Sequence, residues 1–204
     1  LAGATSNLLV SNAGFKPNNV RELIAHARAN PGRVNYGSSG NGTSPHLSME
    51  LFKLMSTTFM VHIPYKGSAP VVTDLLAGQV DVMFDNIPNV INHVKAGKMK
   101  AYAVSGPQRS PLVPEVPTVA ESGLPGYEVS VWFGVLAPAG TPAEIVQRLN
   151  VEIVRILGTA EVRERFSRQG VEVQTSTPEQ YQAFVRSEVT RWAKVIKEAG
   201  IKGD

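Results

Sequence analysis

The sequence predicts an α/β fold, because short apolar stretches alternate with amphipathic stretches through the first half of the chain. The composition is that of a globular protein, with 43% hydrophobic and 18% charged residues. The length of 204 residues suffices for one large domain or two small ones.

The first 105 residues carry a regular order of strand and helix signals. Strands are expected at 8–11, 34–37, 58–63, 80–84 and 100–104. Helices are expected between them, after a cap at Asn18 or Asn19, after a cap at Thr43 or Ser44, at 71–77 and at 87–96. This order predicts a parallel or mostly parallel sheet with helices on both faces. The buried stripe expected on the second helix consists of Leu47, Leu51, Leu54 and Met55.

The remaining residues follow a different pattern. Residues 106–125 are rich in turn signals and are expected to form loops and short helix. A strand is expected at 128–137, as a bridge between two lobes. Capping-box signatures at Thr141 and Thr177 begin two amphipathic helices, and a shorter helix is expected at 161–170. The apolar faces of these helices need a partner, either the first region or a lobe outside this sequence.

The junction between the second strand and the second helix is rich in small polar residues. It reads VNYGSSGNGTSPHLSMELF from Val34 to Phe52. Glycines let a backbone approach a ligand closely, and a helix N-terminus offers unpaired N–H groups and partial positive charge. We therefore predict a site for a carboxylate or phosphate, with a tight turn and helix cap as the alternative. The predicted ligand-binding residues of this loop are Ser38, Ser39, Gly40, Asn41, Gly42, Thr43 and Ser44.

Polar residues follow two other strands at the same expected edge of the sheet. Asp85, at the end of the fourth strand, is predicted to bind the ligand directly or through water. Helix capping is the alternative for Asp85 and carries at least equal weight for Asn86. Lys66, in the turn after the third strand, is a weaker candidate for neutralising an anion. Trp132 is interpreted as a core residue, with a place in a cleft as the alternative.

Composition and motifs disfavour several function classes. The formal net charge is +3 and the basic residues are scattered, so nucleic acid is not an expected partner. The chain has no cysteine, and neither a phosphate-binding Walker loop nor a dinucleotide fingerprint is present, so no cofactor is predicted. The histidines show no metal-ligand spacing, so no metal is predicted. The loop also lacks the nucleophile-elbow pattern, and no nucleophile–base pair stands out, so no catalytic residue is predicted.

Four segments resemble, in this order, the solute-binding proteins of tripartite tricarboxylate transporters, the Bug or TctC-like family. They are VNYGSSGNGTSPHLSMELF, VHIPYKGSAPVVTDLLAGQVDVMFDNIP, SPLVPEVPTVAESGLPGYEV and WFGVLAPAGTP. The resemblance covers essentially all 204 residues.

The resemblance implies a periplasmic receptor of the type II binding-protein architecture, with two α/β lobes that close on a cleft. It implies no enzymatic activity. The expected ligands are small organic acids: dicarboxylates, tricarboxylates, amino acids or aromatic acids. The expected partners are the membrane permease subunits of a tripartite transporter. Carried onto this chain, half of the site falls on residues 39–44, with Asp85 as the next candidate.

The resemblance also implies a domain organisation. Residues 6–128 are expected to form the second α/β lobe, and residues 129–204 a crossover strand and C-terminal helices that pack on the first lobe. The chain starts at Leu1 without a signal peptide. We therefore expect that it begins inside a longer protein whose N-terminal part carries the first lobe, and that the fragment alone binds weakly or self-associates.

Two other function classes stay open. The first is an effector-binding domain of a transcription regulator with the same two-lobed architecture, which requires a DNA-binding segment upstream. The second is an α/β enzyme for acyl or phosphoryl transfer, which the absence of an evident nucleophile–base pair disfavours.

Overall fold

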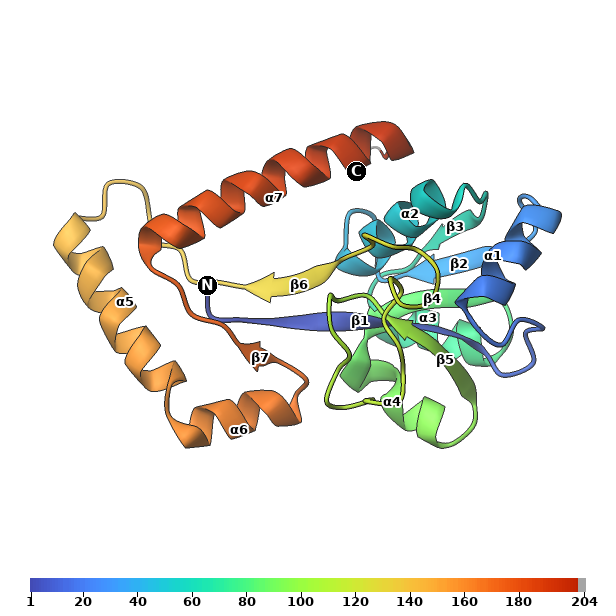
Figure 1. Cartoon of the computed structure of the whole chain (residues 1–204), viewed down its shortest axis with the longest axis horizontal. Helices are drawn as coiled ribbons and strands as arrows, with labels where there is room; N and C mark the ends of the chain where they lie inside the picture. The colour runs from blue at the N-terminus through green and yellow to red at the C-terminus, as the bar shows by residue number, and fades with distance from the viewer. Residues whose placement is uncertain (202–204) are drawn as a thin grey trace. The chain divides into compact units, whose positions relative to one another are not determined.

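The computed structural model describes residues 1–201, which divide into two compact units. We call Ser6–Ser130 with residues 195–201 the sheet unit, and Leu1–Thr5 with Val131–Lys194 the helical unit. Figure 1 labels the elements of both. Within the described residues, no helix has the length and apolar character that crossing a membrane requires.

The sheet unit has the alternating order that the sequence predicts. Its elements are β1 (Gly3–Asn12), α1 (Val20–Ala29), β2 (Asn35–Ser38), α2 (Ser44–Ser56), β3 (Val61–Pro64), α3 (Ser68–Leu76), β4 (Val82–Asn86), α4 (Ile87–Lys95) and β5 (Met99–Val104). Every predicted strand and helix of this region is present, with shifts at the ends. The largest shift is at β1, which begins five residues before the expected position, and β3 and α3 each begin three residues away from theirs.

The sheet of this unit is mostly parallel, as predicted. Its strand order is β3-β2-β4-β1-β5. β2 pairs in parallel with β3 and β4, whereas β1 pairs antiparallel with β4 and β5. Only β1 therefore runs against the other strands of this path. The carboxyl ends of β2, β3, β4 and β5 consequently lie at one edge, where Asn7 of β1 pairs with Asn86 of β4.

Helices cover both faces of the sheet. On one face, α3 and α4 contribute Val71, Leu75, Ile87 and Val90 to a core with strand residues such as Leu8. α1 and α2 lie on the other side of the sheet, away from α4 (Figure 1). Burial of these two apolar layers is the main stabilisation of the unit.

The buried face of α2 differs from the expected one. The helix buries Pro45, His46, Ser48, Met49, Glu50, Phe52 and Ser56, whereas Leu54 is 36% exposed. Phe52 meets Phe84 and Tyr127 at ring-centroid distances of 6.4 Å each. The predicted stripe was wrong because polar side chains occupy this buried face through hydrogen bonds and ring contacts, which hydrophobic periodicity does not reveal.

The helical unit consists mainly of three helices. Its elements are β6 (Ser130–Phe133), α5 (Ala143–Leu157), α6 (Ala160–Arg168), β7 (Glu172–Val173) and α7 (Pro178–Ala199). β7 pairs antiparallel with the first residues of β1, with Gly3 opposite Val173. The strand expected at 128–137 is limited to β6. Trp132 of β6 lies in an aromatic cluster, 6.0 Å from the ring of Tyr181 and 5.4 Å from that of Phe184.

The two predicted capping boxes have different outcomes. At α7 the box is confirmed: the Gln180 N–H donates to Thr177 Oγ1 (3.2 Å) and the Thr177 N–H donates to Gln180 Oε1 (3.0 Å). At α5 the prediction was wrong, because Pro142 is the cap residue and the Thr141 hydroxyl donates to the Pro138 carbonyl instead (2.9 Å).

Candidate functional site

The residues predicted as a ligand site lie at the edge of the sheet where β2, β3, β4 and β5 end. Each of the first three strands leads into a helix: β2 into α2, β3 into α3 and β4 into α4. Three helix N-termini therefore lie at the same edge. This is the position at which open α/β sheets bind ligands, and the helix ends give it a positive potential.

The loop from Ser38 to Ser44, which we call the anion loop, has a backbone that only its glycines adopt easily. Gly40 has φ +137° and Gly42 has φ +70°, in the region that side chains disfavour. The turn after β3 holds the loop, since the Tyr65 N–H donates to the Ser38 carbonyl (3.0 Å) and the Gly67 N–H to the Ser39 carbonyl (3.1 Å). The loop is thus a fixed feature of the sheet edge.

Hydroxyl groups of the anion loop mostly support its own backbone. The Thr43 hydroxyl donates to the Gly40 carbonyl (2.7 Å), and the Ser39 hydroxyl donates to Thr43 Oγ1 (3.3 Å). Thr43 is the cap residue of α2, but its side chain makes no capping hydrogen bond to the helix. The amides of the first turn of a helix have no acceptor within that helix. The first turn of α2 also contains no acidic residue.

Exposure divides the predicted loop residues into two groups. Ser38 is fully buried, whereas Ser39, Gly40, Thr43 and Ser44 are half-buried and Asn41 and Gly42 are exposed. The Gly42 N–H points inward and donates to Nδ1 of His46 (3.0 Å). In this conformation the accessible donors of the anion loop are therefore those near Ser39, Thr43 and Ser44, and Ser38 supports them from beneath.

Asp85 lies inside the protein at the end of β4, with an exposed fraction of 1%. Its carboxylate accepts hydrogen bonds from the Ser68 hydroxyl, from the Asn86 N–H (2.7 Å) and from Asn89 Nδ2 (3.0 Å). Asp85 therefore joins the N-termini of α3 and α4. Asn86 is the cap residue of α4 yet makes no side-chain capping bond, so side-chain capping by Asn86 was a wrong alternative. At this helix end the carboxylate of Asp85 accepts from the Asn86 N–H instead.

Two asparagines, the fully buried Asn7 and the half-buried Asn86, face each other across β1 and β4 at this edge. Asn7 Nδ2 donates to the hydroxyls of Ser48 (3.1 Å) and Ser44 (3.4 Å) on α2. Within residues 1–201, Oδ1 of Asn7 and Oδ1 of Asn86 are the buried side-chain atoms without a hydrogen-bond partner. A buried acceptor left unpaired costs about 1–3 kcal/mol, so both oxygens are expected to accept from water or ligand. Asn7 is not among the residues predicted from the sequence, because it looks like an ordinary strand residue.

A group of stacked rings lies directly beneath the anion loop. His46 and His62 stack at 4.0 Å between centroids with an interplanar angle of 8°, and Tyr36 stacks on His62 at 4.7 Å. Glu50 accepts from the Tyr36 hydroxyl and pairs with Lys53 (2.6 Å). His46, in the first turn of α2, is 5% exposed.

The two histidines are held in the neutral form. The pKa of His62 is lowered to about 4, chiefly by burial and in addition by the neighbouring His46. Burial also lowers the pKa of His46, against the attraction of Glu50. Burial and the hydrogen bond to Glu50 raise the pKa of Tyr36. Neither histidine therefore adds positive charge to the group beneath the loop at neutral pH.

One serine–histidine contact was not foreseen from the sequence. The Ser38 hydroxyl lies 2.6 Å from Nε2 of His62. A nucleophile must reach its substrate, yet Ser38 has an exposed fraction of 0% and also accepts from the Gly40 N–H (3.2 Å). The contact is thus placed to support the loop rather than to attack a ligand.

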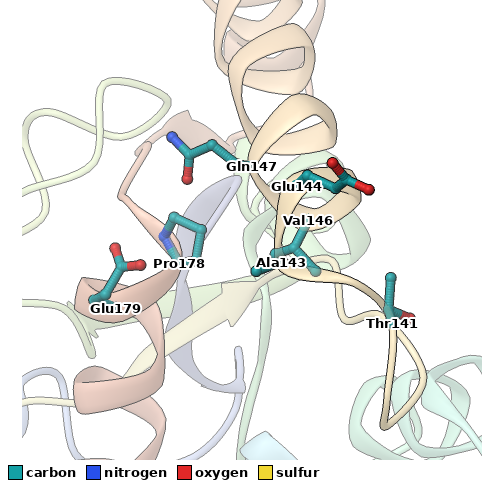
Figure 2. A pocket seen from close by; sticks show the side chains of 7 residues that line it. All are labelled: Thr141, Ala143, Glu144, Val146, Gln147, Pro178 and Glu179. Carbon is teal, nitrogen blue, oxygen red and sulfur yellow. The ribbon is translucent and has the colours of Figure 1, made fainter.

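A pocket in the helical unit lies elsewhere, at the N-terminal turns of α5 and α7 (Figure 2). It is lined by Thr141, Ala143, Glu144, Val146, Gln147, Pro178 and Glu179. Two of these residues carry carboxylates and none is cationic, so the pocket is unfavourable for an organic anion. None of the predicted site residues lines it.

Comparison with known proteins gives a consistent result along the whole described chain. The profile of the TctC family, the tripartite tricarboxylate transporter family receptor, matches residues 1–201. The chain is 39% identical over 202 residues to protein BugT of Bordetella pertussis (strain Tohama I), covering 99% of this chain and 62% of that protein. It is 39% identical over 199 residues to a UPF0065 protein from the tcbD-tcbE intergenic region of Pseudomonas sp. (strain P51), covering 97% and 59%. This chain thus spans less than two thirds of either relative.

Solved structures agree with this assignment and with the expected fold. The structure named R. palustris Rpa4515 with adipate has a TM-score of 0.87 and 40% identity, covering 98% of this chain and 67% of that one. The periplasmic binding protein BugD has a TM-score of 0.84 and 35% identity, covering 100% and 69%. MatC from Rhodopseudomonas palustris with bound malate has a TM-score of 0.79 and 33% identity, covering 95% and 67%. The chain therefore belongs to the TctC family of tripartite tricarboxylate transporter receptors, with the periplasmic-binding-protein fold.

Proposed function

We propose that the protein is a periplasmic receptor that captures a small organic carboxylate at the anion loop and delivers it to the permease subunits of a tripartite transporter. The observation that carries the proposal is the N-terminus of α2. It follows a glycine-rich loop at the ligand edge of the sheet, and its first turn contains no acidic residue. Negative charge is favoured there by the helix dipole and by the unpaired amides.

The neighbouring groups suggest how a carboxylate would be held. One carboxylate oxygen would accept from first-turn amides of α2, and hydroxyls near Ser39, Thr43 and Ser44 would donate to the other. A water molecule that donates to Asn7 Oδ1 or Asn86 Oδ1 would also satisfy these buried acceptors. Asp85 would act behind the site, through the N-termini of α3 and α4, because its carboxylate is 1% exposed.

The ligand class follows from the same groups and from two relatives. Amides and hydroxyls recognise a carboxylate without selecting the rest of the molecule. The names of two solved relatives record adipate and malate as their ligands. We therefore propose a dicarboxylate or a related organic acid as the solute.

Calorimetric titration of the protein at its encoded length with adipate and malate tests this function, after a thermal-shift screen of organic acids. The double variant S39A/T43A is expected to bind severalfold more weakly, because two hydroxyls that shape and line the loop are lost. A Ser187→Ala variant on the exposed side of α7 is the matched control and should bind like the wild type. Unchanged affinity in the double variant would remove the anion loop from the site.

We further propose that residues 129–204 return to a first lobe outside this sequence. On α5, Ile145, Leu149 and Ile156 have exposed fractions of 45%, 49% and 47%. An amphipathic helix normally buries such a stripe. Hydrogen exchange should be slower on α5 in the protein at its encoded length than in this chain alone. Equal exchange would contradict the proposed packing, whereas protection that grows with concentration would indicate self-association instead.

A further inference from the structure

The side chains of two histidines, His46 and His62, contact the anion loop from beneath. Nδ1 of His46 accepts the Gly42 N–H (3.0 Å), at the loop's exposed end. Nε2 of His62 lies 2.6 Å from the hydroxyl of Ser38, at the loop's buried end. The two rings stack at 4.0 Å, so that one unit holds both ends of the loop.

The hydrogen bond from Gly42 determines the protonation state that His46 needs. An imidazole nitrogen that accepts a hydrogen bond carries no proton, so the proton of neutral His46 lies on Nε2. Nε2 is 3.8 Å from Oε1 of Glu50, a separation that favours a proton on that side. If Nδ1 were protonated, its N–H would face the Gly42 N–H, and the hydrogen bond between Gly42 and His46 would be lost.

The groups around the stack fix its position. Glu50 accepts from the Tyr36 hydroxyl and is paired with Lys53, and Lys53 lies 5.2 Å above the centre of the Tyr36 ring. Tyr36 is fully buried and stacks on His62. Glu50, Lys53 and Tyr36 are therefore the ionisable neighbours that face the two histidines. If both histidines were protonated, each imidazolium would be repelled by the other and by Lys53.

We propose that His46 and His62 are positioning residues for carboxylate binding, which hold the anion loop in its binding conformation through Gly42 and Ser38. This inference rests on the proposed function for its effect on affinity. The geometry of the loop itself can be tested without any ligand. Release of the loop would disturb the hydrogen bonds from the Ser39 hydroxyl to Thr43 Oγ1 and from the Thr43 hydroxyl to the Gly40 carbonyl, which shape it.

Matched variants of His46 separate hydrogen bonding from ring packing. His46→Phe keeps a stacked ring but has no acceptor, whereas His46→Asn places an amide oxygen near the position of Nδ1. With adipate as the probe at pH 7.5, His46→Phe is expected to bind at least tenfold more weakly, and His46→Asn within threefold of the wild type. Equal affinities for the two variants would overturn the inference.

His62 provides an independent second pair. His62→Gln retains a polar group near Nε2, and His62→Phe removes it. The same order of affinities is expected, with a loss of at least fivefold for His62→Phe only. This pair decides the question if His46→Phe does not fold, and equal adipate affinities for the two His62 variants would then overturn the inference.

A ligand-free measurement keeps the inference separate from the proposed function. In ¹⁵N NMR spectra of the chain at pH 7.5, Nδ1 of His46 should be unprotonated. The Gly42 amide resonance should move and exchange faster in His46→Phe but not in His46→Asn. A protonated Nδ1, or an unchanged Gly42 amide in His46→Phe, would overturn the positioning role. If the wild type binds neither adipate nor malate while these NMR results hold, the proposed function fails and the positioning role of the loop stands.

A pH series adds a readout that a purely structural role would not change. Affinity of the wild type for adipate should fall more steeply below pH 6 than that of His46→Asn, because only the wild type can protonate Nδ1. Protonation of adipate itself affects both proteins equally and cancels in the ratio. Parallel pH profiles would contradict the requirement for a neutral His46.

Discussion

The junctions after β2 and β4 have similar secondary structure but differ in whether the protein places a carboxylate at the helix N-terminus. Both lead from a strand into a helix with proline in its first turn, at the same edge of one sheet. At the β4–α4 junction, the protein's own carboxylate, Asp85, accepts three hydrogen bonds beside the helix N-terminus. At the β2–α2 junction no acidic residue is present in the first turn.

This difference indicates which helix end can receive an anion from outside. A helix N-terminus favours one negative charge nearby, and a second charge is repelled by the first. The end of α4 already has its charge in Asp85, so it contributes rigidity. The N-terminus of α2 has no acidic residue in its first turn, and the loop before it is exposed to solvent at Asn41 and Gly42.

The largest expected effect concerns Asp85. Replacing Asp85 with Ala leaves the Ser68 hydroxyl, the Asn86 N–H and the Asn89 amide without their acceptor in a buried place. The free energy of unfolding should fall by about 3 kcal/mol. Urea unfolding followed by circular dichroism measures it. Asp85→Asn is the control and should lose about 1 kcal/mol, since an acceptor oxygen remains. A loss below about 1 kcal/mol for Asp85→Ala would mean that the two junctions do not differ in this way.

The second prediction places a charge at the open junction. In Thr43→Asp, a carboxylate would occupy the cap of α2, where it stabilises the helix by about 0.5 kcal/mol but repels an anionic ligand. Affinity for adipate should fall about tenfold or more, equivalent to about 1.4 kcal/mol. Thr43→Asn has nearly the same shape without the charge and should lose much less. For Thr43→Asp, calorimetry should show a lower affinity for adipate, and urea unfolding should show a higher free energy of unfolding. Equal adipate affinities of Thr43→Asp and Thr43→Asn would mean that charge does not explain the effect.

The smallest expected effect is a dependence of stability on pH from the stack beneath the open junction. The pKa of His62 is lowered from 6.5 to about 4 in the folded protein, chiefly by burial. Between these values the unfolded chain binds more protons, so stability should fall as the pH drops from about 6.5 towards 4. For a half-exposed ring we expect about 1 kcal/mol between pH 7 and 5.

Urea unfolding at several pH values measures this dependence. His62→Gln removes the titrating ring and should flatten the curve between pH 7 and 5, while other acidic groups contribute equally to both proteins. Curves that remain parallel would mean that His62 is not held neutral by folding.

Much of the site could be predicted from local sequence. The helix expected after this loop begins at Ser44 with Pro45 in its first turn, and the glycines at 40 and 42 have positive φ angles. These features depend on the chain within a few residues. The histidine stack could not be predicted, because His46 and His62 come from different elements and look like an ordinary helix residue and an ordinary strand residue. The role of Asp85 also needed the position of Ser68, which lies 17 residues earlier in the chain.

The sequence by itself determined the order of strands and helices, the family and the glycine-rich loop before α2, because propensities, turn residues and motifs act over short distances. Tertiary structure alone decided which side chains lie under that loop and where the buried charges are. Contacts such as those between Ser38 and His62 and between Ser68 and Asp85 depend on how neighbouring strands pair and how helices pack on them. The sheet brings distant residues within 3 Å of each other, and no local pattern in the chain records that contact.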